Sequence, residues 1–201
     1  MRMCNECFEL FDYSIREHQS CPRHDCEGTI VEIDTEIAWP ISAINKELKR
    51  QRIPARTNFC CSGHLPNSVH PYVGFEFSEY HLSDEIAPFY MSDFISEILD
   101  PCVRTINSRL KEAQNFITLK HPFESKYEVL PEDPRREYQP YYSRYRLFVN
   151  DLDFRYERSL HTELDRCFAV NFIQMVFKDF LLDCIASIRT VPKSLRFGSW
   201  C

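Results

Sequence analysis

Thr57-Asn58-Phe59-Cys60-Cys61-Ser62-Gly63-His64 is the stretch of sequence around which the rest of the chain is organised. A short run with strand character leads into it, and Tyr72-Val73-Gly74-Phe75-Glu76-Phe77 leads away from it. The second run places apolar residues at alternate positions, which is typical of a half-buried strand. The sequence therefore predicts two strands joined by a loop that holds two thiols, a hydroxyl and an imidazole.

The composition is that of a globular protein with one domain of ordinary size and a small appendage. The chain has 201 residues, of which 44% are hydrophobic and 27% charged. These fractions predict a real hydrophobic core. The formal net charge of −6 disfavours a general nucleic-acid coat, because phosphate binding needs an excess of lysine and arginine. We also expect no membrane span, since charged residues interrupt the most apolar run, residues 168–188.

The cysteines and the first residues of the chain indicate the cellular compartment. The chain has 10 cysteines, and its first residues show no apolar segment of the kind found in secretion signals. We therefore expect a cytoplasmic protein whose paired cysteines are metal ligands or free thiols rather than disulfides.

The N-terminal cysteines have the spacing of a zinc ribbon. Cys4 and Cys7 form a C-x-x-C pair, and Cys21 and Cys26 form a second pair with four residues between them. His24 offers an alternative C-x-x-H pair, but thiolates dominate ribbon sites. A polar segment this short also needs a metal to fold. The sequence predicts a zinc ribbon over residues 1–30, with Zn held by Cys4, Cys7, Cys21 and Cys26.

The remaining residues, 31–201, are predicted to form one α+β domain. A strand at residues 29–34 should precede a helix that ends near Arg50. The apolar stripe of that helix is Ile37, Ile41, Ile44 and Leu48, with Pro40 in the first turn and Asp34 and Thr35 as caps.

The later elements follow a mixed order, which favours the α+β class over alternating α/β. After an extended piece at residues 88–91, a helix should begin near Ser92 and be interrupted by Pro101, and a second helix should run to about Gln114. Strands are expected at residues 116–120, 126–130 and 145–149, with a polar loop at 131–140. The longest helix should span residues 157–189 and supply the main core.

The loop after Phe59 has the residues of an anion-binding site. Gly63 can adopt positive φ and so direct successive backbone N–H groups into one concavity, which suits phosphates. Gly74 leaves space on the returning strand. The predicted ligand-binding residues are Cys61, Ser62, Gly63, His64, Gly74 and Glu76.

Three other interpretations of the same loop stay open. A second metal site would use Cys60, Cys61, His64, His70 and His81, although adjacent residues of a strand point to opposite sides. Alternatively, Cys61 is a nucleophile with His64 as its base, but no third, orienting residue is evident. The simplest interpretation is a tight turn with one buried thiol.

Arginines and tyrosines alternate over residues 135–146. Such a segment can stack bases and grip phosphates. The alternative is a hairpin whose tyrosines pack on the core and whose arginines face water. The acidic balance of the chain favours the hairpin, so we expect little nucleic-acid binding here.

Two resemblances to known groups of proteins rest on these motifs. The Thr57-x-x-Cys60-Cys61-Ser62-Gly63-His64 loop resembles the Ser-Cys-Ser-Gly-Arg loop of the wybutosine-synthesis tRNA methyltransferase family, which uses S-adenosylmethionine; here His64 replaces the arginine. The first 80 residues or so resemble uncharacterised bacteriophage proteins with an N-terminal Zn ribbon, an Ile-Asp strand, a helix and a Cys-Cys-Ser-Gly-His loop. The matching residues are Cys21, Pro22, Asp25, Cys26, Gly28, Ile33, Asp34, Thr57 and Cys60 to His64. The second resemblance implies a phage origin.

Together these features predict a zinc-containing binding protein, phage-encoded, that captures a nucleotide-like or other anionic ligand at the Cys60–His64 loop and interferes with a host process. One alternative is an RNA- or nucleotide-modifying enzyme of the methyltransferase kind. Another is a zinc-ribbon adaptor that binds a host protein. Whether the chain catalyses a reaction stays open at this point.

Overall fold

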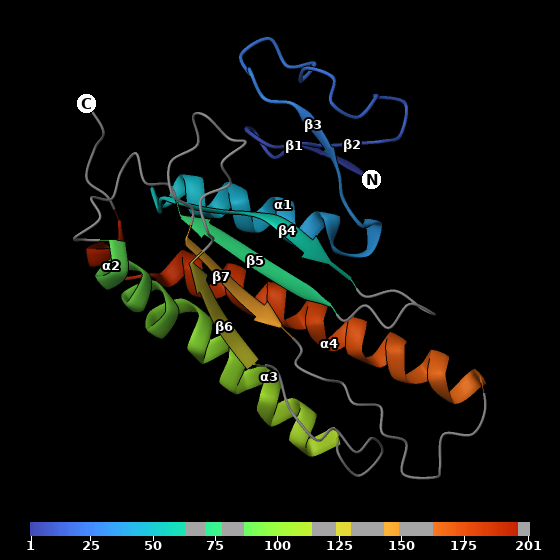
Figure 1. Cartoon of the computed structure of the whole chain (residues 1–201), viewed down its shortest axis with the longest axis vertical. Helices are drawn as coiled ribbons and strands as arrows, with labels where there is room; N and C mark the ends of the chain where they lie inside the picture. The colour runs from blue at the N-terminus through green and yellow to red at the C-terminus, as the bar shows by residue number, and fades with distance from the viewer. Residues whose placement is uncertain (63–70, 78–86, 114–123, 130–142, 149–162, 197–201) are drawn as a thin grey trace.

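The computed structural model describes residues 1–62, 71–77, 87–113, 124–129, 143–148 and 163–196. It contains both helices and strands, so the chain is an α+β protein (Figure 1). The strands are β1 Arg2–Cys4, β2 Leu10–Phe11, β3 Ile30–Glu32, β4 Ala55–Cys61, β5 Tyr72–Phe77, β6 Glu124–Val129 and β7 Ser143–Phe148. The helical elements are α1 Thr35–Arg50, α2 Ala87–Phe94, the π-helix η2 Ile95–Leu99, α3 Asp100–Ala113, α4 Glu163–Thr190 and the 3-10 turn η3 Lys193–Leu195.

The larger sheet is antiparallel, with strand order β4-β5-β7-β6. Strands β4 and β5 pair as the sequence predicts, with Phe59 opposite Gly74 and Cys61 opposite Tyr72. The pairing shifts between Arg56 and Phe59, which indicates a bulge in β4. Cys60 and Cys61, predicted in the loop, belong to β4 instead, where Cys60 lies opposite Val73, so the connection between the two strands begins after Cys61.

Helices α1, α3 and α4 pack side by side, with α4 in contact with both others. Val73 and Phe75 of β5 are fully buried in the same apolar cluster as these helices. The Phe75 ring lies 5.5 Å from the Phe94 ring of α2, centroid to centroid. The core of the described residues therefore lies between one face of β5 and the helices.

Helix α1 buries the four residues of the predicted stripe, and that prediction is confirmed. Two predicted details are wrong. Pro40 lies inside the helix and not in its first turn, because the helix already begins at Thr35. Asp34, at the N-cap position, makes no side-chain capping hydrogen bond. Its carboxylate accepts hydrogen bonds from Ser62 instead.

Helix α1 ends in a Schellman motif. The N–H of Ile53 donates to the Leu48 carbonyl at 2.9 Å, and the N–H of Arg52 donates to the Lys49 carbonyl at 3.1 Å. Arg52 has φ 58°, the left-handed conformation in which helices usually place glycine. The buried side chains of Ile53 and Leu48 complete the motif.

The helical region around Pro101 is longer and less interrupted than predicted. Residues 87–113 form one continuous run of helix, although we expected an extended piece at 88–91 and a break at Pro101. A proline ring in a regular α-helix clashes with the carbonyl four residues earlier. The π-helical turn at Ile95–Leu99, whose hydrogen bonds reach five residues back, ends two residues before the proline and accommodates it.

A smaller sheet, with order β2-β1-β3, stands at the N-terminus and packs on α1. Phe8 is buried in the main apolar cluster, and its carbonyl accepts a hydrogen bond from Ser42 Oγ of α1 at 2.6 Å. Lys46 of α1 pairs with Glu9 at 3.0 Å. The N-terminal sheet is therefore fixed to the main core through one helix.

Several predicted features fall outside the described residues: Gly63, His64, His70, His81, the strand at 116–120, the loop at 131–140 with Arg135 and Arg136, and residues 157–162 of the longest helix. None of the helices in the described ranges is both long enough and apolar enough to cross a membrane.

Candidate metal centre

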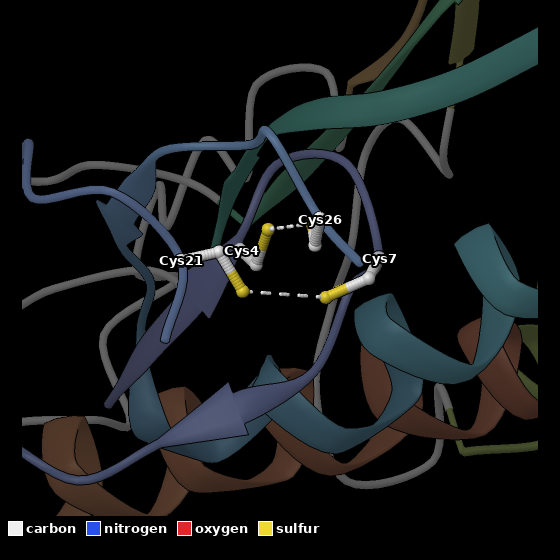
Figure 2. A group of neighbouring side chains, drawn as sticks. All are labelled: Cys4, Cys7, Cys21 and Cys26. Carbon is white, nitrogen blue, oxygen red and sulfur yellow. Dashed lines mark hydrogen bonds between the residues drawn. The ribbon is translucent and has the colours of Figure 1, made fainter. Parts of the chain in front are cut away.

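Four cysteine sulfurs meet at the end of β1, among the turns of the N-terminal segment (Figure 2). The Cys4 and Cys26 sulfurs are 3.5 Å apart, and the Cys7 and Cys21 sulfurs are 3.7 Å apart. All four lie within 4.8 Å of one another. A tetrahedral site with Zn–S bonds of about 2.3 Å requires sulfur separations of about 3.8 Å. The four thiols predicted as ligands therefore lie close enough together to hold one metal ion.

The first pair of cysteines sits on a tight turn after β1. The Glu6 N–H points to the Cys4 sulfur at 3.4 Å, and the Phe8 N–H donates to the Cys4 carbonyl at 3.1 Å. Phe8 closes the turn with φ 60°, a left-handed conformation that is costly for a residue with a bulky side chain. Burial of the Phe8 ring against α1 offsets that cost, since a buried aromatic side chain contributes a few kcal/mol.

The second pair is held by backbone hydrogen bonds that tie it to the first. The Cys21 N–H donates to the Gly28 carbonyl at 2.8 Å, and the Cys26 N–H donates to the Arg23 carbonyl at 3.3 Å. The Asn5 N–H then donates to the Thr29 carbonyl at 3.0 Å. These bonds connect the two turns that carry the sulfurs.

Gly28 is required where the two turns meet. A Cβ placed there would lie 2.5 Å from Glu6 Cβ, 2.6 Å from the Cys4 sulfur and 2.9 Å from Asn5 Oδ1. These distances are all shorter than van der Waals contact. Only glycine lets the backbone of residue 28 approach the first cysteine turn this closely.

The metal-free thiols differ in acidity. Burial alone raises the pKa of Cys4, but the N–H groups of Cys7 and Glu6 and the Cys26 thiol more than offset it, so the pKa is lowered. Burial raises the pKa of Cys7 to about 12, and burial also raises the pKa of Cys21. A divalent cation at the centre stabilises thiolates directly, so it would offset the effect of burial.

His24 is exposed and is not one of the clustered ligands. The choice of Cys26 as the fourth ligand therefore agrees with the geometry. Four thiolates complete a tetrahedral shell and leave no position for water or substrate. This arrangement suits a structural metal and not a catalytic one.

The second predicted site, at the Cys60–His64 loop, is only partly described. Ser62 is buried, and its N–H and hydroxyl both donate to Asp34 Oδ2, at 2.8 and 3.3 Å. Cys61 and Gly74 are also buried. Glu76 lies in β5 opposite Arg56 and Arg144.

Asp34 changes the chemistry expected at this loop. Because its carboxylate uses both donors of Ser62, these donors do not face an anionic ligand. Burial, together with the negative charges of Asp34 and Cys61, raises the pKa of the Cys60 thiol to about 12. Cys60 is therefore protonated at neutral pH and a poor nucleophile.

Three residues of these sites were not predicted in their structural roles. Asp34 was predicted only as a helix cap, and no local sequence signal shows a contact 28 residues away. The sequence indicated Phe8 only as the first residue of a turn-and-strand stretch over residues 8–14. Gly28 stands two residues after a cysteine, and that position is the one signal that could have identified it.

No family model, curated protein or solved structure matches this chain.

Proposed function

We propose that this chain is a zinc-containing binding protein in which residues 1–30 fold as a zinc ribbon with a structural metal. The arrangement of the four cysteine sulfurs is the observation that supports this proposal. A closed shell of thiolates performs no hydrolysis or group transfer, so the metal's role is to hold the two turns and the surface around them.

The test is metal content. We expect one Zn per chain in the purified protein, loss of Zn from Cys26→Ser, and full retention in His24→Ala. The His24 variant is the matched control, because it changes an exposed residue two positions before Cys26. Full occupancy in Cys26→Ser together with loss in His24→Ala would transfer the fourth position to the histidine.

The ligand that we propose first is a small anionic or nucleotide-like molecule at the Cys60–His64 loop. Strands β4 and β5 hold both ends of this loop, and a rigid frame favours a preorganised site. Since Ser62 donates to Asp34, backbone N–H groups and His64 after residue 62 would make the anion contacts. Mass spectrometry of the supernatant from denatured protein tests this: a nucleotide supports it, and S-adenosylmethionine would indicate a methyltransferase instead.

A second candidate function is an adaptor whose ribbon contacts another protein. A groove of about 720 Å³ lies beside the metal centre. It is lined by Glu6, Cys7, Arg23, Asp25, Cys26, Glu27 and Lys49. Charges of both signs on a rigid surface suit recognition of a polar protein segment. Recovery of the protein without any bound small molecule, in a stable complex that Asp25→Lys disrupts, would favour the adaptor.

A further inference from the structure

The C-terminal ends of α1 and α4 lie together at one end of the fold (Figure 1). Gln51 Nε2, just after α1, donates to the Arg189 carbonyl near the end of α4 at 3.4 Å. Arg189 Nε lies 3.5 Å from Glu47 Oε2 of α1. The turn η3 follows α4 directly, so α1, α4 and η3 contribute to one surface.

This surface is strongly basic. We call it the basic end and define it by its five exposed cations: Arg50, Arg52, Arg189, Lys193 and Arg196. Within residues 45–56 and 186–196, Glu47 is the single carboxylate, and Arg50 and Arg189 share it. Arg52 and Lys193 form no ion pair among the residues that the structure describes.

The partial negative charges at the C-terminal ends of the two helices do not account for the positive charge of the basic end. The C-terminus of an α-helix carries a partial charge of about −0.5, so two helix ends require roughly one cation. Glu47 neutralises one more. About three of the five positive charges are left over, on a chain whose net charge is −6.

Arg52 is the most informative member of the basic end. It occupies the left-handed C′ position of the Schellman motif, where glycine has no steric cost. Its side chain is exposed and forms no hydrogen bond or ion pair with the part of the chain that the structure describes. Arg52 therefore adds a solvent-facing cation at a position whose backbone conformation favours glycine.

The helix that contacts η3 carries an exposed aromatic residue. The Tyr90 hydroxyl of α2 donates to the Leu195 carbonyl at 2.8 Å, which fixes α2 against η3. Phe89, the neighbouring residue of α2, has 75% of its surface exposed. An exposed ring beside a group of cations is the arrangement with which proteins bind unpaired bases and their phosphates.

We propose that the basic end binds single-stranded nucleic acid, with its cations on the phosphates and Phe89 against a base. Four of the five cations are arginines, whose planar guanidinium groups donate two parallel hydrogen bonds to a phosphate. An acidic peptide offers comparable charge but no base for the exposed ring. The proposal does not depend on the loop after Phe59 or on the metal.

The test is fluorescence anisotropy of the zinc-loaded full chain with labelled 20-nucleotide RNA and DNA of mixed sequence. For a single strand, the logarithm of the binding constant falls with the logarithm of the salt concentration, with a slope of about −0.7 per phosphate contact. One contact therefore contributes a factor of about eight to the affinity at 50 mM salt relative to 1 M salt. We expect Arg52→Gly and Lys193→Gln each to weaken binding by about that factor and to reduce the slope by about 0.7. We expect Phe89→Ala to weaken binding without changing the slope.

The matched control is Lys178→Gln, which removes an exposed cation of α4 eleven residues before Arg189. It should leave affinity and slope unchanged. Thermal melts of all variants exclude loss of folding as the cause, and Arg52→Gly should melt no lower than the parent protein. The proposal is refuted if the parent protein does not bind either strand at 50 mM salt, if Lys178→Gln weakens binding as much as Arg52→Gly, or if a polyglutamate peptide binds and the oligonucleotides do not.

Discussion

The substitution Gly28→Ala tests the geometry of the metal centre most directly. The added methyl carbon would lie 2.5 Å from Glu6 Cβ and 2.6 Å from the Cys4 sulfur. Carbon atoms in contact are normally about 3.5–4.0 Å apart, so the first cysteine turn must move by about 1 Å. Metal sites tolerate ligand displacements of about 0.2 Å. The movement needed to relieve the clash is therefore larger than the displacement that a tetrahedral metal site tolerates.

Overpacking of this kind costs about 1–3 kcal/mol. If the cost falls on the metal-bound state, zinc affinity should decrease by a factor of roughly 5 to 150, because each 1.4 kcal/mol is a factor of ten. Competition against a chromogenic chelator measures this directly. The matched control is Glu27→Ala, which truncates the exposed preceding residue and should keep the parent affinity within about twofold. Parent-like zinc affinity in Gly28→Ala would refute the reasoning, since the two turns would then not need their close contact.

Three further predictions concern the main domain. Asp34→Ala should lower the free energy of unfolding by about 1–3 kcal/mol in urea titrations, because the buried Ser62 donors lose a charged acceptor; an unchanged value would mean that water replaces the carboxylate. Arg52→Gly should raise the same free energy by about 1 kcal/mol, since glycine adopts φ 58° without strain, and a decrease would show that the arginine stabilises the fold. The raised pKa of Cys60 predicts that the contribution of this thiol to stability is fully present below about pH 9, the value for an unfolded thiol, and is lost as pH rises towards 12, because the folded state holds the proton more tightly. Cys60→Ala should flatten that decline in pH-dependent melts, and an identical decline in the variant would assign it to other groups.

The features that were predicted from sequence are those set by local spacing. Two cysteine pairs on short turns need few residues to form a site, so their positions in the chain were sufficient to identify Cys4, Cys7, Cys21 and Cys26 as neighbours. The apolar stripe of α1 was equally clear, because a period of 3.6 residues is visible within one helix. The β4–β5 pair followed from alternation in β5 and from the polar loop between the strands.

The wrong predictions concern residues whose behaviour depends on other parts of the chain. Pro101 is a strong helix breaker by itself, but the preceding π-helical turn removes the clash, and no local sequence signal marks such a turn. Asp34 is a good helix cap by type, yet Ser62, 28 residues later, provides a buried partner that takes its carboxylate. The cations at the end of α1, including Arg50 and Arg52, are visible in the sequence, where compensation of the helix dipole was the preferred explanation. The additional cations of α4 and η3 join them only in three dimensions. The net charge of −6 describes the whole chain and not this surface.

The attachment of the N-terminal sheet to α1 affects how quickly the protein would be degraded in a cell. Met3 and Phe8 belong to the same apolar cluster as α1, so a metal ion bound by the four cysteines would also stabilise the main core. Any ligand that binds only the folded state adds RT ln(1 + [L]/Kd) to stability, which is about 1.4 kcal/mol for each tenfold increase in free ion. We therefore expect resistance to proteolysis to rise with the free zinc concentration, even for cleavage at sites far from the four cysteines. Zinc starvation would then shorten the lifetime of the whole chain, and the supply of one nutrient metal would set how much of this protein accumulates.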